Sequence, residues 1–322
     1  MKIWCNLLFR EEHAAEKERL ISMLNGHDLD LFPPDMTGAS GKAKEALLAS
    51  EIAFGSPDPD VLIESTNLKW AQLFSAGYTE YDRDDLRRNF ADRGKILTNS
   101  SSVFVEPCAE HVLAMMLSAA RRLPDAILDQ SSRRSWQMQS IRSKSRLLLG
   151  QRVIIYGFGT IGRRLAELLA PFSMDIVGVR RKPSSSDTVR TVTPDDSDEF
   201  LPWADHVVNI LPAASHTNSF FSDLRFSLMR PDAVFYNIGR GTTTDTDALI
   251  QAINTQRIAA AFLDVTDPEP LTSDHPLWTT PNCHITPHTA GGAVDEKSRQ
   301  ITHFVDNFQR YVSDKPLADR IL

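Results

Sequence analysis

The sequence predicts an α/β protein made of two doubly wound domains. Three observations lead to this fold class. Short apolar runs alternate with helical stretches over the first hundred residues, the alternation restarts near residue 150, and a last helical stretch follows the second series. Strands separated by helices form parallel sheets covered on both faces. With 322 residues, the chain is also long for one compact core.

The first series contains five apolar runs that we expect to be strands: KIWCNLLF, LDLF, EIAFG, LKWAQLFSAG and GKILTNS. Helical stretches separate them at 11–24, in GKAKEALLAS and at 58–66. Pro57 falls between a strand and a helix, where a loop tolerates proline. These residues predict the first doubly wound sheet.

A long apolar helix, EPCAEHVLAMMLSAARRL, is predicted at 106–123. It is apolar on nearly every side, so we expect it to be buried, with its methionines as core residues. Cys108 and His111 raise the possibility of a nucleophile and its base. We favour a buried structural thiol instead.

The second series contains six expected strands: RVIIYG, DIVGVRR, HVVNIL, AVFYNIG, AAAFLDV and CHITPH. Helices are expected at 161–172, 219–229 and 245–255. The helical segment AVDEKSRQITHFVDNFQRYVSD follows the last strand, and we expect it to pack on the first domain. The predicted domains are therefore 1–105 with 292–322, and 106–291.

The composition excludes several classes of function. A net charge of -7 gives no overall basic field, which argues against nucleic-acid binding. The N-terminus is acidic and amphipathic, unlike a signal peptide, and no apolar run approaches the ~20 residues of a membrane span. We therefore expect a cytoplasmic protein with no membrane partner.

Gly157, Gly159 and Gly162 form a G-x-G-x-x-G pattern. The pattern follows an apolar strand and opens a helix, the context in which it binds a dinucleotide. Gly157 would permit the tight turn, Gly159 the approach of a pyrophosphate, and Gly162 close packing of helix on strand. Free N–H groups at the helix start would face the anion.

The cofactor preference depends on the end of the next strand. A carboxylate expected there, about 20 residues further on, would hold the ribose of NAD. The sequence has Arg180 and Arg181 instead, followed by Lys182 and three serines at 184–186. A guanidinium can bind a 2′-phosphate through several donors, so NADP is favoured over NAD. The alternative is a solvated strand end.

Three residues near later strand ends are candidates for catalysis: Arg240, Glu269 and His288. Arginine can bind the carboxylate of a 2-oxo or 2-hydroxy acid, and histidine can exchange a proton with its oxygen. A nearby Glu269 would favour the imidazolium form of His288. Each residue also has a purely structural alternative. A zinc site at His284 and His288 is disfavoured because no third ligand is near.

The segments YGFGTIGRRLAELLAPFSMDIVGV, NILPAASHT, FYNIGRG, AAFLDVTDPEPL and NCHITPHTAGG resemble the D-isomer-specific 2-hydroxyacid dehydrogenases. The resemblance covers about residues 105–295 and is looser in the first domain. It implies a Rossmann cofactor domain inserted into a flavodoxin-like substrate domain. It also implies catalytic Arg240, Glu269 and His288, and cofactor contacts from Thr160, Ile161, Leu211, Pro212 and Asp264, the last on the nicotinamide carboxamide.

The resemblance further implies that the amides of Ala76 and Gly77 bind the substrate carboxylate together with Arg240. It implies a homodimer formed through an arm at 124–150 that contains Trp136, which in glyoxylate/hydroxypyruvate reductase-like members lies near the partner's active site. The stretch SSSVFVEPCAEH lacks the glycine usual before this helix. We expect reduction of glyoxylate, hydroxypyruvate or a related 2-oxo acid. The alternative is a dinucleotide-sensing binding protein of the corepressor type.

Overall fold

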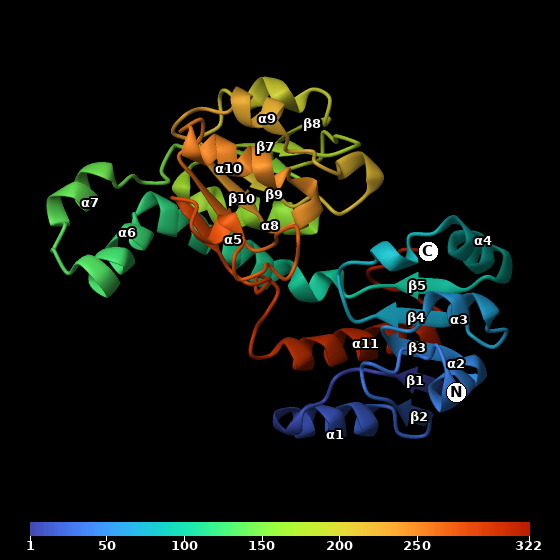
Figure 1. Ribbon diagram of the computed structural model, residues 1–322. Coiled ribbons are helices and arrows are strands. Elements are labelled where there is room, and N and C mark those ends of the chain that lie inside the picture. Colours follow the sequence, from blue (N-terminus) through green and yellow to red (C-terminus); the bar gives the residue numbers. More distant parts are fainter. The chain divides into compact units, whose positions relative to one another are not determined.

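The computed structural model describes all 322 residues, which form two compact units (Figure 1). The first unit comprises Met1–Phe104 and Gly292–Leu322, and the second comprises Val105–Gly291. The second unit is thus inserted in the first. Because the chain returns to the first unit at Gly292, the helical segment that follows the last strand of the second series belongs to the first unit.

The first unit contains a five-stranded parallel sheet in the order β2-β1-β3-β4-β5, which is the flavodoxin-like order. All five predicted strands are present, and helices lie between them. The strands are β1 (Lys2–Cys5), β2 (Asp28–Leu31), β3 (Ile52–Gly55), β4 (Trp70–Leu73) and β5 (Ile96–Thr98); the helices are α1 (Ala14–Met23), α2 (Gly41–Ala49), α3 (Pro59–Glu64), α4 (Asp84–Arg93) and α11 (Glu296–Val312).

The C-terminal helix α11 completes the core of the first unit. The ring of Phe304 stacks on Phe54, with centroids 4.2 Å apart, and on Trp70 at 5.4 Å. These aromatic contacts, together with the burial of Ile301 and Phe308, bury the apolar face of α11 against the sheet. A segment about 190 residues distant in the sequence therefore belongs to the same hydrophobic core.

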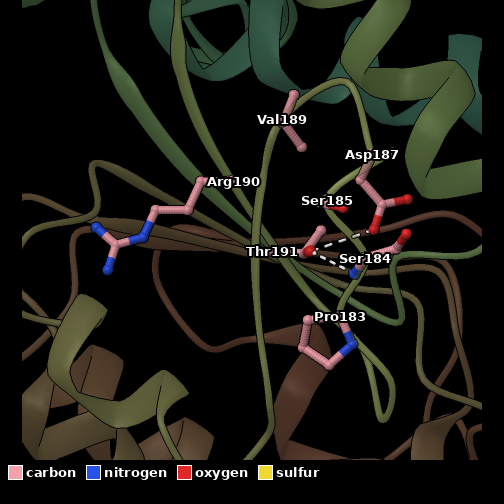
Figure 2. Close-up of a pocket in the computed structure, with 7 residues that line it drawn as sticks. All are labelled: Pro183, Ser184, Ser185, Asp187, Val189, Arg190 and Thr191. Carbon is pink, nitrogen blue, oxygen red and sulfur yellow. Dashed lines mark hydrogen bonds between the residues drawn. The ribbon is translucent and has the colours of Figure 1, made fainter.

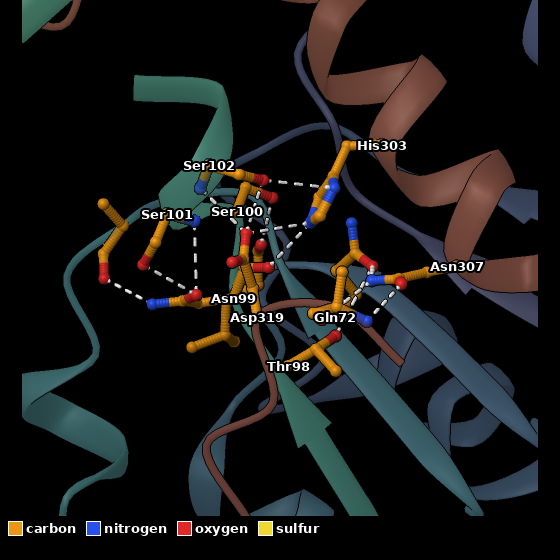
Figure 3. Close-up of polar contacts among 12 residues, drawn as sticks. Gln72, Thr98, Asn99, Ser100, Ser101, Ser102, His303, Asn307 and Asp319 are labelled. Carbon is orange, nitrogen blue, oxygen red and sulfur yellow. Dashed lines mark hydrogen bonds and ion pairs between the residues drawn. The ribbon is translucent and has the colours of Figure 1, made fainter. Parts of the chain in front are cut away.

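The C-terminal residues form polar contacts with the rest of the first unit (Figure 3). Asp319 accepts hydrogen bonds from the backbone N–H and the hydroxyl of Ser102, and its carboxylate lies 3.2 Å from Nε2 of His303. Burial opposes ionisation of Asp319, but these contacts outweigh it and lower the pKa of the carboxyl. Beside it, Ile321 donates its backbone N–H to the carbonyl of Leu97.

The second unit contains a seven-stranded parallel sheet in the order β12-β11-β10-β9-β6-β7-β8. If the strands of this sheet are renumbered in chain order, with β6 as strand 1, the first six lie side by side in the order 3-2-1-4-5-6. This is the Rossmann order. The predicted fold class is confirmed in both units. The strands are β6 (Arg152–Tyr156), β7 (Asp175–Val179), β8 (Arg190–Val192), β9 (His206–Asn209), β10 (Val234–Asn237), β11 (Ala260–Leu263) and β12 (Cys283–Ile285).

The helices of the second unit are α5 (Val105–Ala120), α6 (Leu123–Leu128), α7 (Met138–Lys144), α8 (Thr160–Leu169), α9 (Asp223–Leu228) and α10 (Thr246–Asn254). Helix α9 is shorter than the predicted 219–229. Ser219 has a positive φ of 47°, and Phe221 pairs with Thr244 as an isolated bridge, so the residues before Asp223 cannot be helical. Strand β8 has only three residues and was not predicted.

The helical stretch Ser101–Ala120 has the length and mean hydropathy of a membrane-spanning helix, by composition alone. This differs from the expectation that no apolar run approaches that length. Within the second unit, α5 packs against α8, and Arg164 of α8 forms an ion pair with Glu106 of α5. Burial of Val112 and Met116 is what a core helix requires.

Candidate active site

The sequence-predicted residues of the second unit gather at one edge of its sheet. In a parallel sheet, all strands end at the same edge, and ligands bind there. The residues that follow successive strands are Gly157 to Gly162 after β6, Arg180 and Arg181 after β7, Leu211 and Pro212 after β9, Arg240 after β10, Asp264 and Glu269 after β11, and His288 after β12.

The three glycines have the local geometry of a phosphate-binding turn. Gly157 has a φ of +80°, and a side chain there would meet the carbonyl of Ile210 at 2.7 Å. At Gly159 the space is open, while a Cβ at Gly162 would press on Phe158 at 3.2 Å. Helix α8 begins at Thr160 with no side-chain cap. Its first N–H groups therefore remain available to an anion.

Two further glycines bring neighbouring loops into backbone contact. A Cβ at Gly239 would lie 2.5 Å from the carbonyl oxygen of Leu211, and one at Gly241 would lie 1.9 Å from that of Thr266. No side chain fits at these distances. The loops after β9, β10 and β11 therefore touch each other, with Arg240 between the two glycines.

Arg240 carries a positive charge without a counterion. Its carbonyl accepts hydrogen bonds from the Thr243 hydroxyl at 2.6 Å and from Asn237 Nδ2 at 3.2 Å, which fix the backbone. Its guanidinium donates to the carbonyl of Gly239 and forms no ion pair. A half-buried guanidinium in this state is suited to binding a carboxylate.

His288 and Glu269 form a hydrogen-bonded pair. Nδ1 of His288 contacts Oε1 of Glu269. An ionised carboxylate only accepts hydrogen bonds, so Nδ1 carries a proton and donates it. Nε2 is then the nitrogen that can exchange a proton with another molecule. About half of the His288 side chain is exposed (50%), so this nitrogen is accessible.

The loop that carries His288 is held by Asp264. The side chain of Asp264 is buried and accepts hydrogen bonds from the Thr286 hydroxyl at 2.6 Å, from Thr289 N at 2.8 Å and from Ala290 N at 2.9 Å. His288 itself has a φ of +52°, a left-handed conformation that costs about 1–3 kcal/mol at a non-glycine residue. Bonds on both sides of His288 hold that conformation.

Arg180 is not free, because it forms an ion pair with Asp187 at 2.9 Å. Arg163 of α8 contacts the same carboxylate at 3.1 Å, and Thr191 donates its hydroxyl to it. Burial opposes the charge of Asp187, but the two guanidinium groups outweigh it and lower the pKa. Arg181 is exposed and makes no contact.

Asp187 belongs to the loop between β7 and β8, and this loop lines an open pocket. Figure 2 shows the residues that line it: Pro183, Ser184, Ser185, Asp187, Val189, Arg190 and Thr191. Sequence reasoning missed Asp187 because it follows the strand end by several residues. The signal present in the sequence was an acidic residue after a serine run.

In the first unit, the loop after β4 presents two free amides. The carbonyl of Ala76 accepts a hydrogen bond from Asn99 Nδ2 at 2.7 Å, and that of Gly77 accepts one from the Ser75 hydroxyl at 2.7 Å. The backbone N–H groups of Ala76 and Gly77 donate to no protein acceptor and are partly exposed. Such fixed, unpaired amides can bind an anion.

Cys108 and His111 do not form a nucleophile and base. Burial, together with the negative charge of Asp264, raises the pKa of the Cys108 thiol to about 12, and Arg240 opposes this only partly. His111 contacts Thr286 instead. His284 packs against the ring of Phe262, and its pKa is lowered mainly by burial.

Comparisons with known proteins identify the family. Residues 113–290 match the family described as "D-isomer specific 2-hydroxyacid dehydrogenase, NAD binding domain". The chain is 31% identical to glyoxylate/hydroxypyruvate reductase B of Klebsiella pneumoniae (strain 342) over 275 residues, which is 82% of each protein.

Two solved structures extend the similarity over nearly the whole chain. A D-isomer specific 2-hydroxyacid dehydrogenase family protein from Aeromonas salmonicida is 27% identical, with a TM-score of 0.79 and coverage of 100% and 99%. One from Xanthobacter autotrophicus Py2, in complex with NADPH and MES, is 25% identical, with a TM-score of 0.80 and coverage of 99% and 97%. The chain therefore belongs to the D-isomer specific 2-hydroxyacid dehydrogenase family and is a nicotinamide-dependent oxidoreductase that interconverts a 2-hydroxy acid and a 2-oxo acid.

Proposed function

We propose that this enzyme reduces a small 2-oxo acid, with glyoxylate and hydroxypyruvate as the leading substrates and NADPH as the preferred reductant. The observation that carries the proposal is the hydrogen-bonded pair of His288 and Glu269 on the sheet edge that also bears the unpaired Arg240. The named activity of the Klebsiella relative supports the choice of substrate.

Each residue has a role that follows from its contacts. Arg240 binds the substrate carboxylate, and the free amides of Ala76 and Gly77 are the anion-binding groups of the first unit. Nε2 of His288 gives a proton to the carbonyl oxygen, while Glu269 fixes the ring through Nδ1. The nicotinamide, when bound, supplies the hydride for C2. In the reverse direction, neutral His288 accepts the proton.

The residues present fit a dinucleotide. The uncapped start of α8, at Thr160 and Ile161, would bind the pyrophosphate, with open space at Gly159. Leu211 and Pro212 would lie along the cofactor. Oδ2 of Asp264 accepts only one hydrogen bond, from Ala290 N, so it has capacity for a carboxamide N–H.

The preference for NADPH rests on charge at the end of β7. Arg163 and Arg180 share one carboxylate, Asp187, and Arg181 is unpaired, so the cluster keeps an excess of positive charge. A 2′-phosphate can replace or join Asp187 as the partner of these groups. The NADPH complex of the Xanthobacter relative agrees with this preference.

We further propose a homodimer formed through the arm at 124–150. In this segment the apolar side chains of Ile127, Leu147 and Leu149 are each more than 60% exposed, and Trp136 is 86% exposed. Clustered apolar exposure of this kind is typical of an interface. A cytoplasmic location and the absence of nucleic-acid or membrane partners stay predictions from the sequence.

A turnover assay tests the function. Purified protein is mixed with NADPH or NADH and a panel of 2-oxo acids that runs from glyoxylate to bulkier members, and loss of reduced-cofactor absorbance is followed. Fastest turnover with glyoxylate or hydroxypyruvate is expected. Tight cofactor binding without turnover of any acid would instead favour a dinucleotide-sensing binding protein of the corepressor type.

A further inference from the structure

His111 is a polar side chain in the largely apolar helix α5, and none of the roles above uses it. Its Nε2 lies 3.1 Å from the hydroxyl oxygen of Thr286 and 3.6 Å from Oδ1 of Asp264. The side chain is largely covered, with 23% exposed. The contact joins α5 to the segment after β12, 175 residues further along the chain.

The direction of these hydrogen bonds follows from the carboxylate. Thr286 Oγ1 lies 2.6 Å from Oδ1 of Asp264, which only accepts, so the single hydroxyl proton of Thr286 points to Asp264. The lone pair of that hydroxyl then accepts from His111, and Nε2 of His111 must carry a proton. The chain of donors runs from His111 through Thr286 to Asp264.

This chain ends at the segment that holds His288. Asp264 binds the amides of Thr289 and Ala290, and its own carbonyl accepts from the amide of His288 at 2.8 Å. The left-handed conformation of His288 is therefore fixed by bonds to one residue, Asp264: two amides bind its carboxylate and one binds its backbone carbonyl. These bonds require the Asp264 carboxylate to keep one orientation. The Thr286 hydroxyl helps to fix that orientation, because it donates to Oδ1, the same oxygen that accepts from Thr289 N.

We propose that His111 is a positioning residue, which orients Asp264 through the hydroxyl of Thr286 and thereby holds His288 in place for proton transfer. The inference rests on the proposed role of His288. The nearby Cys108 thiol is buried, and the negative charge of Asp264 also raises its pKa, while the positive charge of Arg240 lowers it.

The test compares three variants with the wild-type enzyme. His111→Leu removes the donor, His111→Gln restores an N–H at the position of Nε2, and Glu110→Gln changes an exposed neighbour on the same helix that makes no contact. We expect kcat to fall by about tenfold or more in His111→Leu, with the Kd for NADPH unchanged. His111→Gln should recover most of the loss, and Glu110→Gln should match wild type.

A second measurement does not depend on turnover. Amide hydrogen exchange at Thr289 and Ala290, in protein without cofactor, should be faster in His111→Leu than in wild type, because the acceptor of these amides is no longer fixed. Thr286→Val, which removes only the hydroxyl, should give the same change. This variant keeps the test valid if His111→Leu does not fold.

Two results would overturn the inference. One is wild-type kcat and exchange in both His111→Leu and Thr286→Val, and the other is an equal loss in His111→Gln and His111→Leu. Failure of the proposed function is recognised separately, because the wild-type protein would then turn over no 2-oxo acid. Failure of the role given to His288 would appear as full turnover in His288→Ala, whatever the exchange of Thr289 and Ala290 shows.

Discussion

At the scale of single residues, each unit contains polar groups that the protein leaves without partners. Arg240 has no counterion, and the amides of Ala76 and Gly77 have no acceptor. A bound anion can accept hydrogen bonds from such groups, since no protein acceptor competes for them. The His288 and Glu269 side chains, in contrast, are paired with each other, which fixes the free nitrogen of His288.

Replacement of the proton-transfer residue should separate chemistry from binding. His288→Ala is expected to lower kcat for 2-oxo acid reduction by about 10²–10⁴-fold, the usual contribution of a positioned acid. The Kd for NADPH, measured by cofactor fluorescence, should stay within about twofold. A variant that retains wild-type turnover would contradict the assignment of His288.

Two substitutions at the end of β7 should change cofactor preference in opposite directions. Arg180→Asp removes a phosphate-binding cation and should raise KM for NADPH far more than KM for NADH. Asp187→Asn frees Arg163 and Arg180 from their shared carboxylate and should raise the preference for NADPH. Steady-state kinetics with both cofactors measure the ratio. Equal losses with both cofactors in Arg180→Asp would mean that the arginine is only a charged strand end.

At the scale of elements, loops between strands and helices carry the chemistry while the strands supply rigidity. Strand β9 contains a buried histidine, His206, that makes the free energy of unfolding depend on pH. Nδ1 of His206 contacts the hydroxyl of Tyr236 at 2.9 Å, and burial lowers the pKa of His206 to about 4. The unfolded chain takes up this proton near pH 6.5. Protonation therefore favours the unfolded chain between pH 6.5 and pH 4.

The free energy of unfolding should accordingly fall as the pH decreases through this window. His206 alone should contribute a loss of about 2 kcal/mol between pH 7 and pH 5. Urea unfolding of the wild type and of His206→Gln at both pH values measures the difference. The variant should show a smaller decrease, and an equal decrease in both proteins would exclude His206 as the cause.

At the scale of the whole molecule, the exposed arm should control assembly. Ile127→Asp places a charge among the exposed apolar side chains at 124–150, and it should shift a dimer toward monomer. Val312→Asp is a matched control, since Val312 is also an exposed apolar residue but lies on α11. Sedimentation velocity measures the mass. A wild-type chain that sediments as a monomer would contradict the proposed dimer.

The strands of both sheets other than β8 could be predicted because each is a short apolar run bounded by turn residues. The glycine turn and the candidate catalytic residues could also be placed along the chain, since each follows a strand within a few residues. Strand β8 and the true length of α9 could not be predicted. The first is too short to show periodicity, and the second is limited by the pairing of Phe221 with a distant Thr244.

The sequence by itself determined the fold class, the family and the order of the candidate reacting residues, because these depend on local periodicity and on motifs next to strand ends. Only the tertiary structure showed that Arg180 is paired with Asp187, and that His111 donates to Thr286. Arg180 and Asp187 lie in one loop, but Arg163 of α8 shares the same carboxylate, and the His111 contact joins α5 to the segment after β12. Their partners are set by where the chain returns in space, and no local pattern encodes that.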